Sequence, residues 1–441
     1  MSATRKTLRL LREFESRNIT FMEPDGSWPI VWARARGVHV WDAEGRKYLD
    51  LTAAFGVAAA GHANPRVVRA GQRQMARLLH AMGDVHPHAL KAELARRLSA
   101  LTFERWCAPP KSTAHGKVIF TNSGFEAVEA ALKTALLATG KRGVIAFEGA
   151  YHGLGYGALN ATHRDHFRRP FQSQLGRFAH FVPFPRLDGP ARSQPAAVED
   201  RLRRRLQKKD IGAILVEPIQ ARGGIHVPPP EFLPRLRELC DESGTLLIFD
   251  EIYTGFGRTG RWFAAEHSGT VPDLICLGKA LTGGFPLSAC VGRAGLMDAA
   301  WPASTGEAIH TSTFLGHPVG CAMALAEIDE IERLQLPERA ARLGEYLLAA
   351  LRKIPLPSQL TGSVRGLGLM AGLELTQADG RPASALTLAA IKALLHRGYV
   401  FLPEGADANV ISFTPPLTIT RRQLGQAVAA LADSLNRRPR A

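Results

Sequence analysis

Residues 245–251 read TLLIFDE, and residues 274–281 read LICLGKAL. Each stretch is a short apolar run that ends in charged side chains, Asp250 and Glu251 in the first and Lys279 in the second. Apolar runs of this length are typical of strands that are buried on both faces. In an open parallel sheet, ligands bind beyond the carboxyl ends of the strands. We therefore expect these charged groups to meet at one edge of a buried sheet.

Three further apolar runs precede these two, and helical patterns lie between them. The runs cover residues 118–120, 144–147 and 214–216, and the helical patterns include residues 126–138 and 232–242. Strand–helix alternation of this kind predicts an α/β fold, with a mostly parallel central sheet and helices on both faces.

The two chain ends predict a smaller α+β domain. Helical patterns and strand-like runs alternate near the C-terminus, at residues 321–333, 367–375, 386–397 and 410–413. Near the N-terminus, residues 38–51 predict a hairpin that turns at residues 43–45. We expect three parts: an N-terminal segment that packs on the small domain, a large ligand-binding domain and the small domain itself, at residues 1–60, 61–325 and 326–441.

The composition is that of an ordinary soluble protein, with 46% apolar and 22% charged residues in a chain of 441. No stretch approaches the roughly 18–20 uninterrupted apolar residues that a membrane span needs. The five cysteines are scattered, and neither a CxxC pair nor a His/Cys cluster has zinc spacing. The basic N-terminal stretch predicts an amphipathic helix, because Glu13 and Glu15 follow at once. We expect a cytoplasmic protein without a membrane span or a metal site.

The net charge of +15 raises the question of a nucleic-acid partner. The densest basic run holds six cations between Arg201 and Lys209, and Leu202 and Leu206 interrupt it four residues apart. This spacing favours the solvated face of an amphipathic helix over a nucleic-acid patch. Neither aromatic interleaving nor a DNA-binding motif supports the patch.

A turn of small residues follows the run at residues 118–120 and reads TNSGFEA, residues 121–127. The free N–H groups and the dipole at a helix start make an anion site. Ser123 would add a hydroxyl there, and Gly124 would let the backbone approach the anion closely. The alternative is a plain helix start that Ser123 caps.

Asp250 and Lys279 each have two interpretations. A carboxylate at the end of so apolar a strand is costly to bury unless it is paired, either with a protonated pyridine nitrogen or with Arg258 or Arg261. Burial lowers the pKa of a lysine, and a neutral amine can form a Schiff base with an aldehyde; the alternative is a lysine that reaches the surface. Phosphate site, ring-nitrogen carboxylate and amine together are what a pyridoxal-phosphate pocket requires.

At these residues the sequence resembles the class III aminotransferases of pyridoxal-phosphate fold type I, and the resemblance covers almost the whole chain. The matching stretches are GHANP (61–65), the turn at 121–127, YHG (151–153), VEPIQ (216–220), DEIYTGFGRTG (250–260), GKA (278–280) and HTSTFLGHP (310–318).

The resemblance implies pyridoxal 5′-phosphate as the cofactor. Lys279 would carry it as a Schiff base and move the proton, and Asp250 would pair with the ring nitrogen. Ile252 would pack under the ring and Tyr151 over it. The remaining cofactor residues would be His152 beside Tyr151, Glu217 behind these groups, and Ser123, Gly124 and the Phe125 backbone at the phosphate. Thr313 would reach the phosphate of the neighbouring subunit, so the resemblance implies a homodimer with shared active sites.

The departures from the family pattern concern the substrate. Many members carry an Arg that grips the substrate carboxylate where this chain has Ser412, and a Glu where it has Arg222. Phe55 stands where ornithine-handling relatives have a Tyr, and Tyr253 stands where many have a Gln. We therefore expect Phe55 and Arg222 to contact the substrate, with the planar fork of Arg222 as the carboxylate clamp. The alternative is that Arg222 is an ordinary loop arginine.

The expected activity is amino transfer from an amine or ω-amino acid donor to an oxo-acid acceptor by a ping-pong mechanism. The same lysine would also serve an aminomutase or a decarboxylase, so these activities are the closest alternatives. A cofactor-binding regulatory protein that binds DNA through its basic surface is a further alternative.

Overall fold

The computed structural model describes residues 2–107, 114–186 and 189–436. A seven-stranded sheet forms its centre, in the order β4-β10-β9-β8-β7-β5-β6. The strands are β4 (Gly116–Thr121), β5 (Gly143–Phe147), β6 (Ala179–Val182), β7 (Ile211–Val216), β8 (Leu246–Asp250), β9 (Leu274–Leu277) and β10 (Ser288–Arg293). Only β10 runs against its neighbours β4 and β9. The predicted mostly parallel sheet is confirmed, and β6 and β10 join the five strands that the apolar runs predicted.

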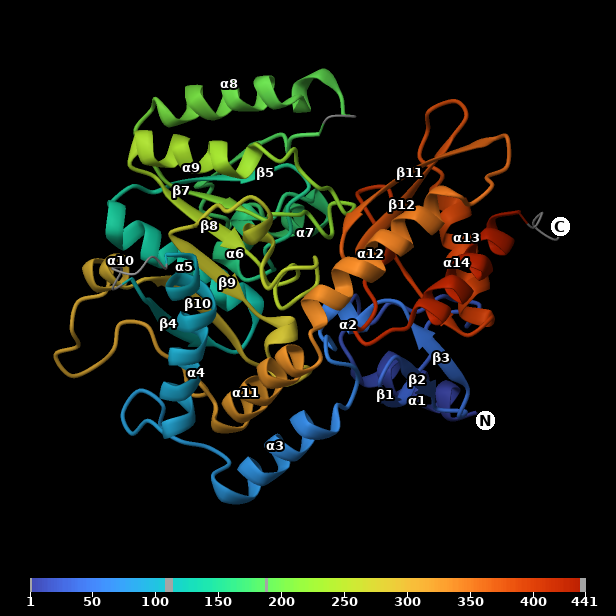
Figure 1. Cartoon of the computed structure of the whole chain (residues 1–441), viewed down its shortest axis with the longest axis horizontal. Helices are drawn as coiled ribbons and strands as arrows, with labels where there is room; N and C mark the ends of the chain where they lie inside the picture. Colours follow the sequence, from blue (N-terminus) through green and yellow to red (C-terminus); the bar gives the residue numbers. More distant parts are fainter. Residues whose placement is uncertain (1, 108–113, 187–188, 437–441) are drawn as a thin grey trace.

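Helices cover both faces of this sheet, as predicted (Figure 1). On one face, α8 (Pro195–Leu206) and α9 (Phe232–Ser243) pack on Ile145, Ile214 and Leu247. On the other, α5 (Gly124–Thr139) packs on Val144 and Ala213, which alternate with those residues along their strands. Because both faces are covered, successive residues of a strand are all apolar, which explains the unbroken runs in the sequence.

The N-terminal strands form a second sheet with a strand from the other end of the chain. Its order is β1 (Trp32–Arg36), β2 (His39–Asp42), β3 (Lys47–Asp50) and β13 (Tyr399–Val400). The predicted hairpin is confirmed, because β2 and β3 pair antiparallel. Strand β13 pairs parallel with β3, so the N-terminal segment lies against the C-terminal part of the chain.

A third sheet in the C-terminal part has the order β11-β12-β15-β14. Its strands are β11 (Leu360–Leu367), β12 (Met370–Gln377), β14 (Leu402–Glu404) and β15 (Val410–Phe413). The strand predicted over residues 367–375 is confirmed from Met370 onward as part of β12, but its continuity is wrong, because Leu367 ends β11. Gly368 has a φ of +55°, and the chain reverses there, so that Leu367 pairs with Met370. A residue without Cβ adopts this backbone conformation without steric cost, which makes Gly368 the turn.

The remaining helices complete the layers. They are α1 (Ala3–Phe14), α2 (Ala53–Gly56), α3 (Pro65–Arg77), α4 (Ala89–Ser99), α6 (Tyr156–Ala161), α7 (Asp165–Arg168), α10 (Ala294–Ala300), α11 (Pro318–Arg333), α12 (Leu336–Arg352), α13 (Ser384–His396) and α14 (Arg421–Asn436). The boundary predicted at residues 325–326 falls inside the continuous helix α11. A division of the chain there would cut a helix and not a linker, and the three-part division stays a prediction.

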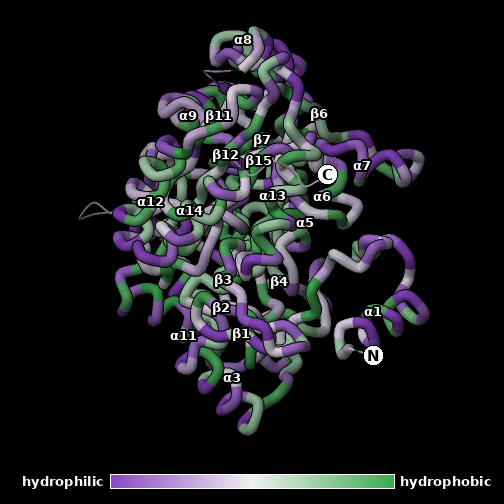
Figure 2. Tube along the Cα trace, turned by 90° about the vertical axis from the view of Figure 1, so that its right-hand side faces the viewer, coloured by the Kyte–Doolittle hydropathy of each residue, from purple (hydrophilic) through white to green (hydrophobic). Residues whose placement is uncertain are grey.

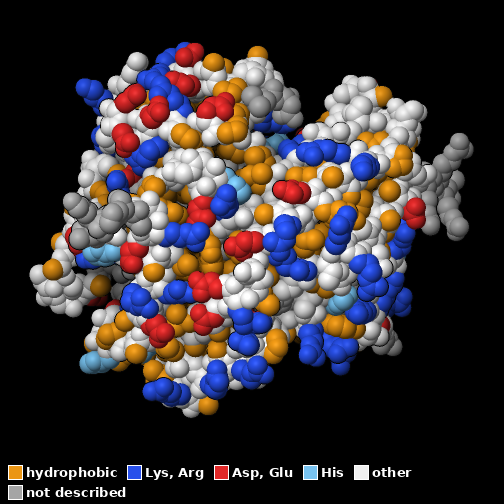
Figure 3. All heavy atoms as spheres, viewed as in Figure 1, with side chains coloured by type: hydrophobic (Ala, Val, Ile, Leu, Met, Phe, Trp, Pro, Cys, Tyr) orange, Lys and Arg blue, Asp and Glu red, His pale blue; other side chains and the backbone are white. Residues whose placement is uncertain are grey.

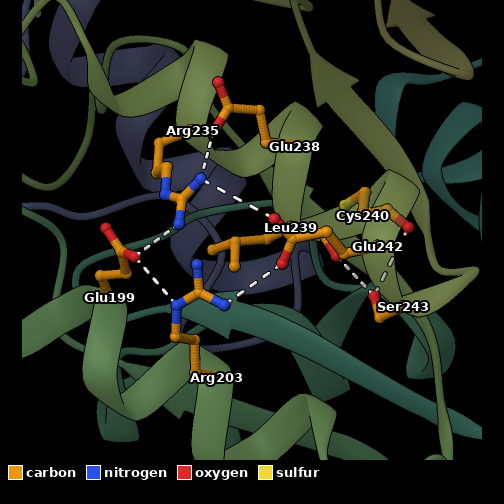
Figure 4. A network of polar contacts seen from close by, with 8 residues as sticks. All are labelled: Glu199, Arg203, Arg235, Glu238, Leu239, Cys240, Glu242 and Ser243. Atoms are coloured by element: carbon orange, nitrogen blue, oxygen red, sulfur yellow. Dashed lines mark hydrogen bonds and ion pairs between the residues drawn. The ribbon is translucent and has the colours of Figure 1, made fainter.

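The basic run at residues 201–209 lies on α8 and just after it. Leu202 and Leu206 are buried, so the amphipathic interpretation is confirmed. One cation of the run, Arg203, joins a network of charged side chains between α8 and α9 (Figure 4): it donates to Glu199 at 2.9 Å, and Arg235 of α9 donates to the same oxygen at 2.9 Å. Figure 3 shows Lys, Arg, Asp and Glu side chains intermixed over this part of the surface.

The predicted N-terminal helix is present as α1, which stands apart from most of the chain in Figure 2. Thr4 connects it to the β2–β3 turn by donating its backbone N–H to Glu44 at 2.9 Å. Among residues 2–107, 114–186 and 189–436, no helix is both long and apolar enough to cross a membrane. Within the same residues, no group of three or more His, Cys, Asp or Glu side chains is placed to hold a metal ion.

Candidate active site

A cavity of about 680 Å³ opens at the carboxyl ends of β4, β8 and β9. It brings together ten of the twelve site residues that the sequence predicted. These are Phe55, Gly124, Phe125, Tyr151, His152, Glu217, Arg222, Asp250, Ile252 and Lys279. The residues come from loops far apart in the sequence, and they meet because parallel strands present their carboxyl ends at one edge of the sheet.

Lys279 follows β9 directly and points into this cavity. Burial lowers the pKa of its amine, while the carboxylates of Asp250 and Glu217 act in the opposite direction. The Nζ atom lies 4.7 Å from the centre of the Tyr253 ring. Lys279 is therefore not a lysine that reaches the surface, and its amine is more easily deprotonated than that of an exposed lysine.

Asp250 ends β8, and its carboxylate is buried beside the cavity. Its Oδ2 lies 2.8 Å from Nδ1 of His152, and its Oδ1 accepts the backbone N–H of Ile252 at 3.1 Å. Arg258, one of the two alternative partners, instead donates to the backbone oxygen of Leu369 at 3.1 Å. The other, Arg261, is exposed. The carboxylate is thus held in place by groups that leave it facing the cavity.

His152 has one ring nitrogen without a partner. The Nε2 atom is buried and makes no hydrogen bond within the described residues, while Nδ1 faces Asp250. The backbone N–H of His152 donates to Thr162 Oγ1 at 3.0 Å, which fixes the loop that carries it. A buried polar atom without a partner is costly, so Nε2 is suited to a ligand group.

Glu217 holds the backbone that presents Tyr151. Its two oxygens accept the N–H of Tyr151 at 3.0 Å and the N–H of Ala221 at 3.2 Å. Burial and, to a smaller extent, the nearby carboxylate of Asp250 raise the pKa of Glu217 to about 7. The side chain thus connects the loop after β5 with the loop after β7.

The turn between β4 and α5 presents hydrogen-bond donors that suit an anion. Glu126 caps the helix start, because its carboxylate accepts the N–H groups of Asn122 at 2.7 Å and Ser123 at 3.1 Å. The Ser123 hydroxyl is buried and makes no hydrogen bond within the described residues. A Cβ on Gly124 would lie 3.0 Å from Ile252 Cδ1, so only glycine leaves this wall open. The hydroxyl and the first N–H groups of α5 are therefore available to an anion.

Arg222 lies at the cavity wall, where it pairs with a carboxylate that the sequence reasoning missed. Its Nη1 is 3.1 Å from Oε2 of Glu404, which ends β14 and is 3% exposed. Burial raises the pKa of Glu404 to about 7, and Arg222 acts against this shift. Glu404 could not be found from its local sequence, LPEG, because nothing there indicates which loop it faces.

Of three further residues, Thr313 and Ser412 do not line the cavity, whereas Tyr253 does. Thr313 is exposed and does not line the cavity, although its neighbour Ser312 accepts a hydrogen bond from Asn122 at 3.4 Å. Ser412 donates to the backbone oxygen of Leu402 at 3.1 Å, which places it within the third sheet. Tyr253 faces Lys279 with its ring, and its hydroxyl lies 3.1 Å from Thr414 Oγ1.

These donors and acceptors fit pyridoxal 5′-phosphate. The free hydroxyl of Ser123 and the start of α5 suit a phosphate, and the carboxylate of Asp250 suits a protonated pyridine nitrogen. Lys279 supplies an amine for an aldehyde. Ile252 and Tyr151 supply an aliphatic and an aromatic wall for a flat ring.

Comparison with known proteins assigns nearly the whole chain to the family that the sequence motifs resemble. The family Aminotransferase class-III matches residues 21–435. An acetylornithine aminotransferase of Methanosarcina mazei is 37% identical over 94% of this chain and 93% of its own. A 5-aminovalerate aminotransferase of Pseudomonas aeruginosa is 38% identical over 92% and 93%. The PLP-bound (internal aldimine) structure of an amine transaminase from an uncultivated Pseudomonas species superposes with a TM-score of 0.85, at 30% identity, over 96% of this chain and 98% of that one.

Proposed function

Because this chain belongs to the class III aminotransferases, which use pyridoxal 5′-phosphate, we propose that it moves an amino group from an amine or ω-amino acid to an oxo acid in two ping-pong half-reactions. The observation that carries the proposal is Lys279, a buried amine with a lowered pKa in one cavity with Asp250 and the start of α5. The bound cofactor supplies an electrophilic aldehyde and a cationic ring that takes up electron density.

The protein residues around the cofactor would divide the work of proton transfer and orientation. Lys279 Nζ, once the donor amine has released it, would accept the proton from the donor carbon, and burial, which lowers its pKa, favours the neutral amine that this role needs. Asp250, held by His152, keeps the ring nitrogen protonated. Ser123, Gly124 and Phe125 anchor the phosphate, so that the ring cannot turn while the proton moves.

An amine or ω-amino acid is the donor that fits the cavity best. Ser412 bonds within the third sheet and offers no cation for an α-carboxylate. Phe55 makes one cavity wall apolar and suits a donor without a charge near its reacting carbon. Among the relatives, the Pseudomonas aeruginosa enzyme is named for 5-aminovalerate, an ω-amino acid.

Arg222 is our candidate for the carboxylate clamp of the oxo acid. The recorded contacts of its guanidinium with Glu404 use Nη1 alone. A guanidinium carries five N–H donors, so its other edge can bind a carboxylate bidentately while Nη1 stays on Glu404. Glu404 then serves to hold the fork in one orientation.

The clamp is tested by the KM for pyruvate and 2-oxoglutarate. We expect Arg222→Ala to raise that KM by about tenfold or more, since a hydrogen bond to a charged group contributes on the order of 1.5–3 kcal/mol. The KM for the amine donor should not change. Arg222→Ala also leaves the Glu404 carboxylate without its cation, so Arg222→Ala/Glu404→Gln is the matched control. An unchanged oxo-acid KM in both variants would refute the clamp.

A homodimer with shared active sites is part of the proposal. The exposed apolar side chains Met82, Ile309 and Phe314 lie on two loops that meet, since Thr311 donates to Asp84 at 2.7 Å. Exposed apolar side chains gathered in this way are typical of an interface. Thr313 lies on the same surface, next to Phe314, from where it would reach the phosphate site of the partner subunit.

The activity is tested by borohydride trapping and by product analysis. Reduction of the cofactor-loaded protein should attach the cofactor at Lys279, as located by peptide mass spectrometry, and Lys279→Ala should abolish this adduct. When the enzyme is tested with a panel of amine donors, each accepted donor should yield one molecule of carbonyl product for each molecule of oxo acid aminated. Release of carbon dioxide or an isomeric product without an oxo acid would instead identify a decarboxylase or an aminomutase on the same scaffold.

A further inference from the structure

A turn of left-handed helix lies at the mouth of the active-site cavity, in α2. Ala53, Ala54, Phe55 and Gly56 have φ angles of +47°, +50°, +62° and +79°. Residues with a Cβ usually visit this region singly, because the Cβ then crowds the following carbonyl oxygen. A run that includes three such residues persists only where the surrounding structure holds it.

The carboxylate of Asp50 holds the start of this turn. Its Oδ1 accepts the N–H of Thr52 at 2.8 Å and the Thr52 hydroxyl at 2.6 Å. Its Oδ2 accepts the N–H of Ala54 at 3.2 Å and lies 2.7 Å from Nε2 of His62. Asp50 is fully buried at the end of β3, so a single carboxylate gathers four donors from three other residues.

The other end of the turn packs against the ring that faces Lys279. A Cβ on Gly56 would lie 2.9 Å from Tyr253 Cε1, so glycine is required for this approach. The Tyr253 hydroxyl lies 3.1 Å from Thr414 Oγ1, which donates to the backbone oxygen of Thr52 at 3.3 Å. The turn is thus fixed between Asp50 on one side and Tyr253 on the other.

Phe55 is the residue that this turn presents. Its side chain lines the 680 Å³ cavity and also a second cavity of about 260 Å³, whose apolar walls include Trp28, Ile30 and Leu402. Phe55 is 51% exposed, so burial of its own ring does not fix its position. The backbone conformation of α2 sets the direction in which the side chain leaves the chain, and the ring borders both cavities.

We propose that Asp50 is a positioning residue that sets donor specificity, because it holds the left-handed turn that keeps Phe55 between the two cavities. The inference rests on the proposed function, in which Phe55 borders the donor. Asp50 touches neither cavity and acts only through the turn. Loss of its carboxylate should let Phe55 leave this position and admit a bulky donor substituent to the second cavity.

The test compares 1-phenylethylamine with butylamine as donors, using the ratio of their kcat/KM values. Phe55→Ala removes the ring and should raise this ratio about tenfold. Asp50→Asn should raise it in the same direction, because the amide donates towards Ala54 N–H and His62 where the carboxylate accepted. In the Phe55→Ala background, Asp50→Asn should change the ratio by less than about twofold. An unchanged ratio, or an equal change in both backgrounds, would overturn the specificity role.

A second readout does not depend on activity. Hydrogen exchange of the backbone amides of residues 52–58 should become about tenfold faster in Asp50→Asn, because Ala54 N–H loses its acceptor. Asp42→Asn is the matched control: Asp42 is a buried carboxylate of the same sheet that accepts Tyr48 OH at 2.7 Å and lines neither cavity itself. Unchanged exchange in Asp50→Asn would refute the positioning itself.

Gly56→Ala supplies an independent variant if Asp50→Asn does not fold. It disturbs the same turn from the Tyr253 side without burying an unpaired group, and it should raise the donor ratio in the same direction. An unchanged ratio in Gly56→Ala would count against the proposal. Faster exchange in Asp50→Asn, together with a wild-type enzyme that aminates no oxo acid from any amine or ω-amino acid of the donor panel, would overturn the proposed function and leave the positioning of the turn intact.

Discussion

Replacing Glu327 with Gln should remove a large part of the pH dependence of stability. Glu327 lies on α11, is 1% exposed, and accepts the backbone N–H of Ala60 at 2.9 Å. Burial, with a smaller contribution from the nearby Glu330, raises the pKa of its carboxyl to about 8 from an ordinary 4.5. The folded protein thus keeps a proton on Glu327 that the unfolded chain releases at much lower pH.

The sign and size of the effect follow from linkage. Between pH 4.5 and 8 the folded state binds about one proton more than the unfolded state, so the free energy of unfolding falls as the pH rises. The slope is about 1.4 kcal/mol per pH unit, and the whole shift corresponds to about 5 kcal/mol. A glutamine keeps an oxygen for Ala60 and cannot ionise. The free energy of unfolding of Glu327→Gln, measured relative to that of the wild type, should therefore rise by about 3 kcal/mol as the pH increases from 5.5 to 8.

The assay is urea unfolding of the cofactor-loaded protein, followed by circular dichroism at several pH values from 5.5 to 8. Other buried carboxylates also titrate, so the quantity to read is the difference between the wild type and Glu327→Gln. Glu332→Gln removes a more exposed carboxylate from the same helix and serves as the matched control. We expect its free energy of unfolding to change with pH as steeply as that of the wild type. If the free energies of unfolding of the wild type and Glu327→Gln differ by a constant amount across this pH range, the raised pKa of Glu327 is refuted.

Three shorter predictions concern the cofactor site and the subunit interface. Asp250→Asn should lower kcat by on the order of a hundredfold with the cofactor still bound, because an amide cannot keep the ring nitrogen protonated; wild-type turnover would contradict the pairing. Gly124→Ala should weaken cofactor binding by about tenfold in a titration of the apoenzyme, since the added Cβ crowds Ile252; unchanged affinity would place the phosphate elsewhere. Ile309→Asp should halve the mass measured by sedimentation and lower activity, whereas Leu137→Asp, at another exposed apolar position, should do neither.

The sequence allowed the fold to be predicted well where burial repeats along the chain. Strands β5, β7, β8 and β9 are covered on both faces, and their unbroken apolar runs reflect that directly. The short strand β13 was missed because two residues are too few to show a strand pattern, and only their pairing with β3 makes them a strand. The hairpin at Gly368 was missed because β11, LTGSVRGL, is largely polar, lies mostly exposed or half-buried and gives no apolar signal, while its last residue, the turn and β12 read as one apolar run.

The candidate site was predictable where a motif combines chemistry with position. Lys279 and Asp250 follow apolar strands, so their sequence context alone indicated burial and a shared edge. Arg222 was predicted as a substrate residue, yet its partner Glu404 was not, because the two are 182 residues apart and meet only through the third sheet. Pairings of this kind depend on how sheets pack and leave no periodic signal.

Asp50 and Asp250 show why local sequence identifies a buried carboxylate and not its use. Both end a strand, in KYLD and in LLIFD, and both pair with a histidine, His62 at 2.7 Å and His152 at 2.8 Å. Asp250 faces a cavity large enough for a cofactor, whereas the oxygens of Asp50 accept backbone and side-chain donors of the turn that follows. The same costly group is left open to a ligand in one place and is fully occupied by protein donors in the other. The donors that surround a carboxylate, and not its position at a strand end, therefore decide whether it binds a ligand or shapes the wall beside one.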